Sequence, residues 1–400
     1  MRIQTMKFID ETVGPPLCFF LFLFNKFISL FFRRRNIDPA AVKNIVLMKF
    51  FGMGSIIMAG PLMRALRTRF PNAKIIILTF SENAELCRRI DLIDEILTVE
   101  PKTPLKFMLT ISRVFFYLQR KKCEISIDLE FFSKFSTIIQ YLCTGKTRVG
   151  YYIIQQGILL RMLWRGNLLT HNVYYNPHRH TIEVFLALGR AIGADTNDLS
   201  LARIGVNDDD RRRLDTLLAE TGIEPEEKLI AMNINASSLC LERRWPIERF
   251  AELSRRILEN FPCRIVLIGS RSEMPYSTRL MEMTGKDPRV VNLAGVLDIG
   301  MLALLFSRVV MFITNDSGPL HIAVSTNTPT VSLFGPEIPE RYGPQGGTHD
   351  VLYSGLYCSP CLNAYNQKIA SCGGDNECMK RIPVDEVYDK VAARLAGARL

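Results

Sequence analysis

The stretch from residue 313 to residue 321 reads ITNDSGPLH, and it decides the fold class of this chain. It follows an apolar strand pattern at Val309–Ile313, passes through a polar turn with a glycine, and enters a helical pattern at Pro319–Ser325. A strand followed by a small-residue turn and a helix is the repeating unit of a doubly wound parallel sheet. The backbone amides of such a turn, at a helix N-terminus, can bind a phosphate group.

Four residues of this turn are candidate ligands for an anionic group. The backbone N–H groups of Ser317 and Gly318 can face a phosphate. Asp316 either caps the helix or contacts the ligand. His321 falls in the first helical turn, where it either faces the ligand or packs in the core.

The same alternation of strand and helix runs in two series from residue 43 onward. The first series predicts strands at Ile45–Met48, Ile75–Leu78, Ile96–Val99, Ile125–Leu129 and Arg148–Gly150, and helices at Ser55–Phe70, Asn83–Arg89, Leu105–Gln119 and Lys134–Cys143. The second predicts strands at Leu229–Ile234, Arg264–Ile268, Val290–Leu293, Val309–Ile313 and Thr330–Leu333, and helices at Pro246–Phe261, Glu273–Thr284, Asp298–Phe306 and Pro319–Ser325. A charge-dense helical stretch at 207–228 separates the series.

We therefore predict an α/β protein with two Rossmann-like, doubly wound parallel-sheet domains facing a cleft. The predicted domains are residues 43–222 and 223–400, preceded by a hydrophobic segment at residues 1–42. A length of 400 residues fits two domains, and 48% hydrophobic with 22% charged residues excludes a disordered chain.

The net charge of +10 is concentrated in the first half of the chain. Residues 1–50 hold eight basic and three acidic residues (+5), residues 101–180 hold twelve and three (+9), and the remainder sums to −4. This distribution predicts an anionic partner, either a membrane surface or a phosphorylated substrate. Nucleic acid is disfavoured, because no recognised nucleic-acid-binding motif accompanies the charge.

Residues 15–32 read PPLCFFLFLFNKFISLFF and are followed by three arginines, Arg33 to Arg35. The run approaches the length of a membrane span but is interrupted by Asn25 and Lys26. A cleaved signal peptide fits poorly, because acidic residues precede the run and no small-residue cleavage site follows it. We predict attachment to the cytoplasmic face of a membrane through residues 15–35, with peripheral or monotopic insertion favoured over a full span, which stays open. The alternative is a helix packed on the body of the protein.

The first predicted strand ends in the motif KFFGMGS at residues 49–55. Gly52 and Gly54 allow a tight turn and a close approach of ligand to the backbone. The motif is not the dinucleotide fingerprint G-x-G-x-x-G, because Ile57 occupies its last glycine position. An NAD-dependent oxidoreductase is therefore disfavoured.

Further polar turns follow strands of the second series, namely a loop at 233–238, ERRWP at 242–246, GSRSE at 269–273 and LFGP at 333–336. Guanidinium groups in the second of these can neutralise a diphosphate. Several such turns at successive strand ends describe a nucleotide-sugar site better than a single phosphate site. The candidate binding residues in these turns are Asn235, Arg243, Arg244, Gly269 and Glu273.

Together with NLAG at residues 292–295, these motifs resemble glycosyltransferase family 9, the ADP-heptose:lipopolysaccharide heptosyltransferases, over Asn44 to Val391. The resemblance implies a GT-B fold, a donor nucleotide held mainly by the C-terminal domain and an acceptor held by the N-terminal one. It also implies inverting transfer, without metal or cofactor, from a nucleoside-diphosphate sugar onto a lipid-linked saccharide of the lipopolysaccharide core.

The same resemblance assigns roles to individual residues. Arg243 stands where the family has a phosphate-binding lysine, and Glu273 matches the acidic residue that reaches the nucleoside. The loop Asp316–His321 matches the loop that binds the diphosphate and the sugar.

One position departs from the family pattern. The first motif of the family ends in Gly-Asp, and that aspartate is taken as the general base, whereas this chain has Ser55. A serine does not act as a base at neutral pH without a partner. Because the predicted strand Ile125–Leu129 ends at the same sheet edge, we expect Glu130, or failing that Asp128, to accept the proton. The alternative is that Glu130 only caps the following helix.

The cysteines form two groups. Six are scattered through apolar stretches, as reduced core thiols are, which favours a cytoplasmic protein. The other four form a C-terminal cluster with the spacing Cys358-x2-Cys361-x10-Cys372-x5-Cys378. This cluster is a candidate zinc site, a pair of disulfides or a set of reduced thiols.

Two rival functions stay open at this point. One is a transferase of another nucleoside-diphosphate sugar in cell-surface glycan synthesis, because the nucleoside pocket cannot be identified from sequence. The other is a catalytically silent nucleotide-sugar-binding protein, in which Ser55 marks the loss of the base.

Overall fold

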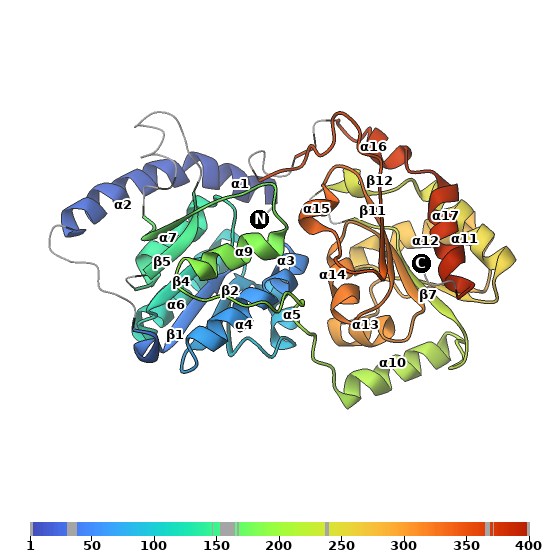
Figure 1. Cartoon of the computed structure of the whole chain (residues 1–400), viewed down its shortest axis with the longest axis horizontal. Helices are drawn as coiled ribbons and strands as arrows, with labels where there is room; N and C mark the ends of the chain where they lie inside the picture. The colour runs from blue at the N-terminus through green and yellow to red at the C-terminus, as the bar shows by residue number, and fades with distance from the viewer. Residues whose placement is uncertain are drawn as a thin grey trace. The chain divides into compact units, whose positions relative to one another are not determined.

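The computed structural model describes residues 3–29, 38–145, 147–152, 165, 168–236, 240–364, 369–370 and 372–397. It divides into two compact units, Met1–Ala202 and Arg203–Leu400, each built on its own sheet (Figure 1). The boundary lies earlier than the expected position at residue 222. Helix α10 (Asp208–Glu220) belongs to the second unit, since it packs on α13 (Ile299–Phe306) and its Arg213 pairs with Asp298 at 2.5 Å.

The first unit contains a six-stranded sheet in the order β3-β2-β1-β4-β5-β6, with every neighbouring pair parallel. Its strands are β1 Asn44–Met48, β2 Lys74–Phe80, β3 Glu95–Val99, β4 Ile125–Asp128, β5 Thr147–Tyr152 and β6 His171–Tyr174. The direction of the strand order reverses between β1 and β4. In sheets of this kind, ligands bind beyond the carboxyl ends of the strands at this switch point.

Helices cover both faces of this sheet: α3 Met53–Met58, α4 Gly60–Arg69, α5 Ala84–Arg88, α6 Pro104–Lys121, α7 Lys134–Cys143 and α9 Thr181–Arg190. Side chains of α6 and α7 share one core cluster with alternate residues of β1 and β2, so these two helices cover the same face. Helices α4 and α9 pack against each other.

The single helix predicted at Ser55–Phe70 is in fact two helices, α3 and α4, which meet at Ala59. Pro61 fits at the start of α4, where its missing N–H costs nothing. At Gly60 a Cβ would lie 2.4 Å from the backbone nitrogen of Ala202, so the chain approaches too closely for any side chain.

The second unit repeats the topology, with all-parallel strands in the order β12-β11-β10-β7-β8-β9. Its strands are β7 Leu229–Asn233, β8 Arg264–Leu267, β9 Val290–Asn292, β10 Met311–Asn315, β11 Thr330–Phe334 and β12 His349–Tyr353. Its remaining helices are α11 Ile247–Asn260, α12 Met274–Met283, α14 Gly318–Ser325, α15 Pro339–Tyr342, α16 Glu377–Lys380 and α17 Val384–Leu395. Here the switch point lies between β7 and β10. The predicted α/β class with two doubly wound parallel sheets is confirmed.

Two helices at the N-terminus, α1 (Ile3–Thr12) and α2 (Gly14–Ser29), pack along α7 (Figure 1). The carboxylate of Asp10 accepts hydrogen bonds from the backbone nitrogens of Lys134 (3.1 Å) and Phe135 (2.6 Å), so it caps the start of α7. A Cβ at Gly14 would lie 2.6 Å from that of Lys134, and Cys18 is fully buried. The segment therefore rests on the protein along one side.

The opposite side of α1 and α2 is apolar and exposed. Residues Thr5–Phe27 form a stretch long and apolar enough to cross a bilayer, and only 17% of its apolar 18-residue window is buried. Arg33 to Arg35, which belong to the predicted membrane-attachment segment, lie outside the described residues.

Candidate functional site

The carboxyl ends of β1 and β4 meet at the switch point of the first sheet, and one side chain joins them. Glu130 follows β4, and its Oε1 accepts hydrogen bonds from the backbone nitrogens of Phe50 (2.6 Å) and Phe51 (2.9 Å). Its Oε2 accepts one from Lys49 Nζ at 3.0 Å, and this ion pair is almost completely buried. Glu130 thus lies at the edge where its sequence position predicts it, and its carboxylate also holds the turn after β1.

The turn after β1 has a backbone conformation that favours glycine. Gly52 has φ +86°, a conformation that favours glycine, and a Cβ there would lie 3.2 Å from Ser55 Oγ. Ser55 is half-buried in the first turn of α3, and Gly54 is buried beside it. The residue at the family's base position thus lies directly against the turn that Glu130 fixes.

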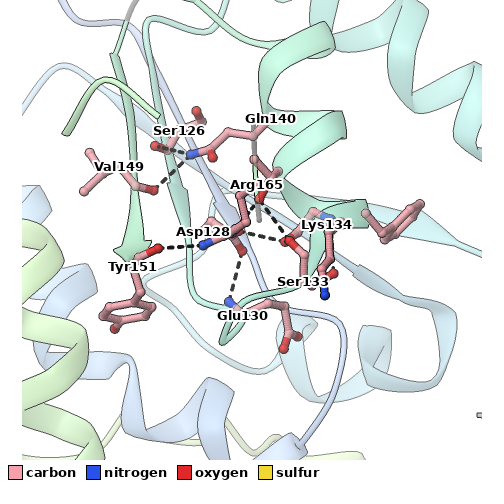
Figure 2. Close-up of polar contacts among 12 residues, drawn as sticks. Ser126, Asp128, Glu130, Ser133, Lys134, Gln140, Val149, Tyr151 and Arg165 are labelled. Atoms are coloured by element: carbon pink, nitrogen blue, oxygen red, sulfur yellow. Dashed lines mark hydrogen bonds and ion pairs between the residues drawn. The ribbon is translucent and has the colours of Figure 1, made fainter. Parts of the chain in front are cut away.

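Asp128, the second candidate base, has no exposed surface. Figure 2 shows its carboxylate enclosed by protein donors, with Arg165 bonded to one oxygen. Ser136 Oγ donates to it at 2.7 Å, and the backbone nitrogen of Glu130 at 3.0 Å. Burial raises the pKa of Asp128 to about 6, against the opposing pull of Arg165, so the carboxylate is ionised at neutral pH. Asp128 is therefore the weaker candidate, because a reacting hydroxyl cannot reach it without displacing these partners.

The guanidinium of Arg165 makes further bonds that tie β4, β5 and α7 together. It donates to Thr137 Oγ1 at 2.5 Å and to the carbonyl oxygen of Tyr151 at 2.8 Å (Figure 2). Sequence reasoning missed this buried pair, because Arg165 lies 37 residues from Asp128. The excess of basic residues over 101–180 was the one available hint.

In the second unit, Asn315 joins three of the predicted turns. It is fully buried at the end of β10, where its Oδ1 accepts from the backbone nitrogen of Trp245 (3.0 Å). Its Nδ2 donates to the carbonyl oxygen of Asn235 at 3.1 Å. The ERRWP turn, the loop after β7 and the NDSGP turn are therefore held together at one switch point, between β7 and β10.

Arg243 and Asp316 face each other in this cluster. Arg243 Nε lies 3.2 Å from Asp316 Oδ2, and its other nitrogen lies 3.8 Å from Glu337 Oε2. Within the described residues, Arg243 Nε, Arg244 Nε and Asp316 Oδ2 are buried atoms without a hydrogen bond. Arg243 Nε and Asp316 Oδ2 contact each other as an ion pair, but without a hydrogen bond. Because buried polar atoms rarely lack hydrogen bonds, these three atoms mark a place where a polar ligand would complete the bonding. Glu337, a partner of Arg243, was not among the predicted site residues.

The remaining predicted residues surround Arg244. Its guanidinium stacks 4.3 Å from the ring centre of Tyr276, and it donates to Asn235 Oδ1 at 3.4 Å. At Gly269, a Cβ would lie 3.1 Å from Asn235 Nδ2. Glu273 Oε2 accepts from the backbone nitrogen and hydroxyl of its own turn, at Ser270, so one oxygen serves as a helix cap.

The turn after β10 positions its amides at the start of α14. Ser317 Oγ bonds to Thr314 Oγ1 (2.9 Å) and accepts from Asn233 Nδ2 (3.2 Å), and it does not cap the helix. Gly318 is half-buried as the first residue of α14, and His321 is buried one turn later. The backbone N–H groups of this turn can therefore bind an anion at the N-terminus of α14.

The four C-terminal cysteines come together in space, as their closeness in sequence suggests. Cys358, Cys361, Cys372 and Cys378 line one cavity of about 40 Å³. All four are free thiols, and burial raises the pKa of Cys378 to about 11. No group of three or more histidine, cysteine or acidic residues with a metal-binding arrangement occurs in the described part of the chain.

Comparison with known proteins connects this geometry to one family. Residues 135–369 match the model of glycosyltransferase family 9 (heptosyltransferase). Lipopolysaccharide heptosyltransferase 2 of Escherichia coli K12 is 29% identical over 100 residues, which are 24% of this chain and 28% of that protein. The aligned segment thus spans less than a third of this relative's length.

Two solved structures share the fold. The family 9 glycosyltransferase of Veillonella parvula has a TM-score of 0.73 and 20% identity, covering 91% of this chain and all of that one. The ADP-heptose heptosyltransferase II of E. coli has a TM-score of 0.68 and 19% identity, covering 90% of this chain and all of that one.

Proposed function

The chain belongs to glycosyltransferase family 9, and from this premise we propose that it transfers heptose from ADP-heptose to a lipid-linked saccharide of the lipopolysaccharide core. The observation that carries the proposal is the group of buried polar atoms without hydrogen bonds, Arg243 Nε, Arg244 Nε and Asp316 Oδ2. Arginines suit a diphosphate, and a carboxylate oxygen suits a sugar hydroxyl, so one nucleotide sugar would satisfy all three.

The donor would bind to the second unit. Its diphosphate would lie against the amides of Ser317 and Gly318, with Arg244 and the helix dipole of α14 balancing its charge. The positive charge of Arg243 is already shared with Asp316 and Glu337, so we expect it to orient the donor as well as attract it. The name of the E. coli structural neighbour, an ADP-heptose heptosyltransferase, supports ADP-heptose as the donor.

The acceptor would bind to the first unit, whose excess of basic residues suits a phosphorylated saccharide. We propose direct attack of an acceptor hydroxyl on C1 of the donor, with inversion, in a reaction that uses no metal or cofactor. Glu130 remains the proposed base. Its carboxylate keeps slight exposure at the switch point, and Oε2 accepts from Lys49 alone among the described residues, which leaves it a lone pair.

We also propose that the protein works at the cytoplasmic face of the inner membrane. Helices α1 and α2 rest on the protein along one side and expose apolar residues along the other. This arrangement supports the interfacial mode over a spanning one, because a spanning helix would have to leave α7.

A titration tests the proposed donor. Thermal unfolding of detergent-purified protein is followed with ADP, UDP, GDP, CDP or TDP, without added metal. A ligand that binds the folded state stabilises it by about 2.7 kcal/mol at a hundred times its dissociation constant. Stabilisation by ADP alone is the expected result. Stabilisation by another nucleotide would replace heptose with a different sugar.

A transfer assay with ADP-heptose and a core acceptor then separates an enzyme from a silent binding protein. Formation of a heptosylated product is expected. Binding of ADP without any product, from any sugar nucleotide, would favour the silent protein.

A further inference from the structure

Helix α6 carries an apolar face that no described residue of its own unit covers. Leu105, Met108, Leu109 and Phe116 are between 54% and 70% exposed. Their spacing of three, four and seven residues places them on one side of the helix. The opposite side packs normally, with Val114 and Leu118 buried in the core. An exposed face of this size on a well-packed helix indicates an interaction surface.

The charges of α6 point to the chemistry of its partner. The helix has four basic residues and no acidic one, and Lys106, Arg113 and Arg120 are exposed. A helix with a large apolar face bordered by lysine and arginine is the kind that lies in the interface of an anionic bilayer.

The position of α6 agrees with this assignment. Both α6 and α2 pack against α7, and α6 and α7 cover the same face of the first sheet (Figure 1). Along α2, the exposed apolar residues Leu17, Phe20, Phe24 and Phe27 form a similar stripe. Two helices that pack on α7 therefore each carry a stripe of exposed apolar residues.

We propose that α6 and α2 together form one bilayer-binding surface, and that its occupant is an anionic lipid membrane. This inference rests on the membrane location proposed above and deepens it by adding a second attachment helix, which begins 75 residues after the end of α2 in the chain. Binding forms no covalent bond.

Aromatic contacts connect this surface to the candidate acceptor edge. Phe107 of α6 packs on Phe135 of α7, with ring centres 5.5 Å apart, and Phe135 packs on Phe50 at 5.2 Å. Phe50 belongs to the turn that Glu130 holds. A lipid-linked acceptor drawn from a bilayer at α6 would therefore arrive beside the switch point of the first sheet.

Vesicle flotation of the full-length protein tests the proposal. The variant Leu105→Gln/Leu109→Gln/Phe116→Gln changes exposed side chains, so the fold should be unaffected, and α2 stays intact. Its partition coefficient onto phosphatidylethanolamine–phosphatidylglycerol vesicles should fall by roughly tenfold to a hundredfold, because three large apolar groups no longer enter the interface. The matched control, Leu199→Gln/Val206→Gln/Val351→Gln, changes three other exposed residues and should bind as the wild type does.

A second variant of the same experiment tests the basic residues of α6. Lys106→Gln/Arg113→Gln/Arg120→Gln should weaken binding to the anionic vesicles and leave binding to pure phosphatidylcholine vesicles unchanged. If instead the apolar α6 variant binds the anionic vesicles like the wild type, the proposal is wrong. It is equally overturned if that variant changes only the oligomeric state of the protein, since a second copy would then be the occupant.

A direct contact measurement covers the case in which the triple variant misfolds. In Phe116→Trp, brominated lipids should quench the added fluorescence, whereas Val206→Trp in the second unit should not respond. Equal quenching at both positions would overturn the proposal. Neither vesicle binding nor quenching needs turnover, so a protein that binds through α6 but transfers no sugar would refute only the proposed function.

Discussion

The substitution Glu130→Gln tests most directly how the first sheet edge works. Glutamine keeps an oxygen for the amides of Phe50 and Phe51, at the places where Glu130 accepts at 2.6 and 2.9 Å. It puts an NH₂ group against the ammonium of Lys49, which now donates at 3.0 Å. One partner of an almost completely buried ion pair is thereby lost.

The substitution should have two effects, one on the stability of the protein and one on kcat. Leaving a buried ammonium unpaired costs about 3 to 5 kcal/mol of stability, with the lower end expected because Glu130 keeps slight exposure. Loss of a general base reduces kcat by about 100- to 10,000-fold. A residue that only positions the turn would lower activity as well, so the two roles need a further variant.

The double variant Lys49→Met/Glu130→Gln separates them. Removing the ammonium takes away the unpaired charge, so most of the lost stability should return. If Glu130 is the base, kcat of the double variant stays at the level of the single one. The assays are denaturant unfolding and product formation from ADP-heptose.

Glu124→Gln is the matched control, because Glu124 Oε2 also accepts two backbone amides, at Lys43 and Asn44, but at the opposite end of β1. Its kcat should stay within a few-fold of the wild-type value. Recovery of kcat in the double variant would refute Glu130 as base and leave it a positioning residue.

Three further predictions follow from other contacts. Asn315→Ala leaves two buried backbone groups unpaired, which costs about 2 to 5 kcal/mol and should abolish the thermal shift with ADP; an unchanged shift would contradict its role. Gly295→Ala should destabilise the protein far more than Gly285→Ala. Both glycines have positive φ, but only at Gly295 would a Cβ lie 2.7 Å from the backbone of Arg271. Unfolding midpoints of the two variants measure the difference, and equal midpoints would contradict it. Burial raises the pKa of Asp128 from 3.8 to about 6, so its contribution to stability is fully present well below pH 3.8 and is lost as pH rises through 6. The wild type should lose about 2 kcal/mol relative to Asp128→Asn between pH 4 and 7, and parallel curves would contradict the raised pKa.

The sequence predicted the inner strands and two edge strands, β3 and β9, but missed the other two edge strands, β6 and β12. Strands such as β1 and β10 are continuous apolar runs between turns, and that pattern is specific. Strands β6 (HNVY) and β12 (HDVLY) lie at sheet edges, where only part of each strand is buried, so no clear pattern marks them. The turns at the carboxyl ends of the inner strands could also be located, because each begins where a recognisable apolar run ends.

The contacts that side chains make with other strands and loops could not be predicted from the sequence. Glu130 could be placed beside the first turn, because neighbouring parallel strands end at one edge. That its carboxylate accepts the amides of Phe50 and Phe51 depends on the register of β1 with β4 and on a side-chain rotamer. The pairing of Arg243 with Asp316 and Glu337 depends likewise on three separate loops.

The cap that Asp10 places on α7 has a practical consequence for producing this protein. Hydrophobic leaders are commonly deleted to obtain a sample that needs no detergent. Here the deletion would uncap the first amides of α7, at Lys134 and Phe135, only a few residues beyond Glu130. A shortened recombinant chain would thus lose a supporting contact of the proposed acceptor edge, and its inactivity would say nothing about the full-length enzyme. Solubilising the full-length chain keeps that contact intact.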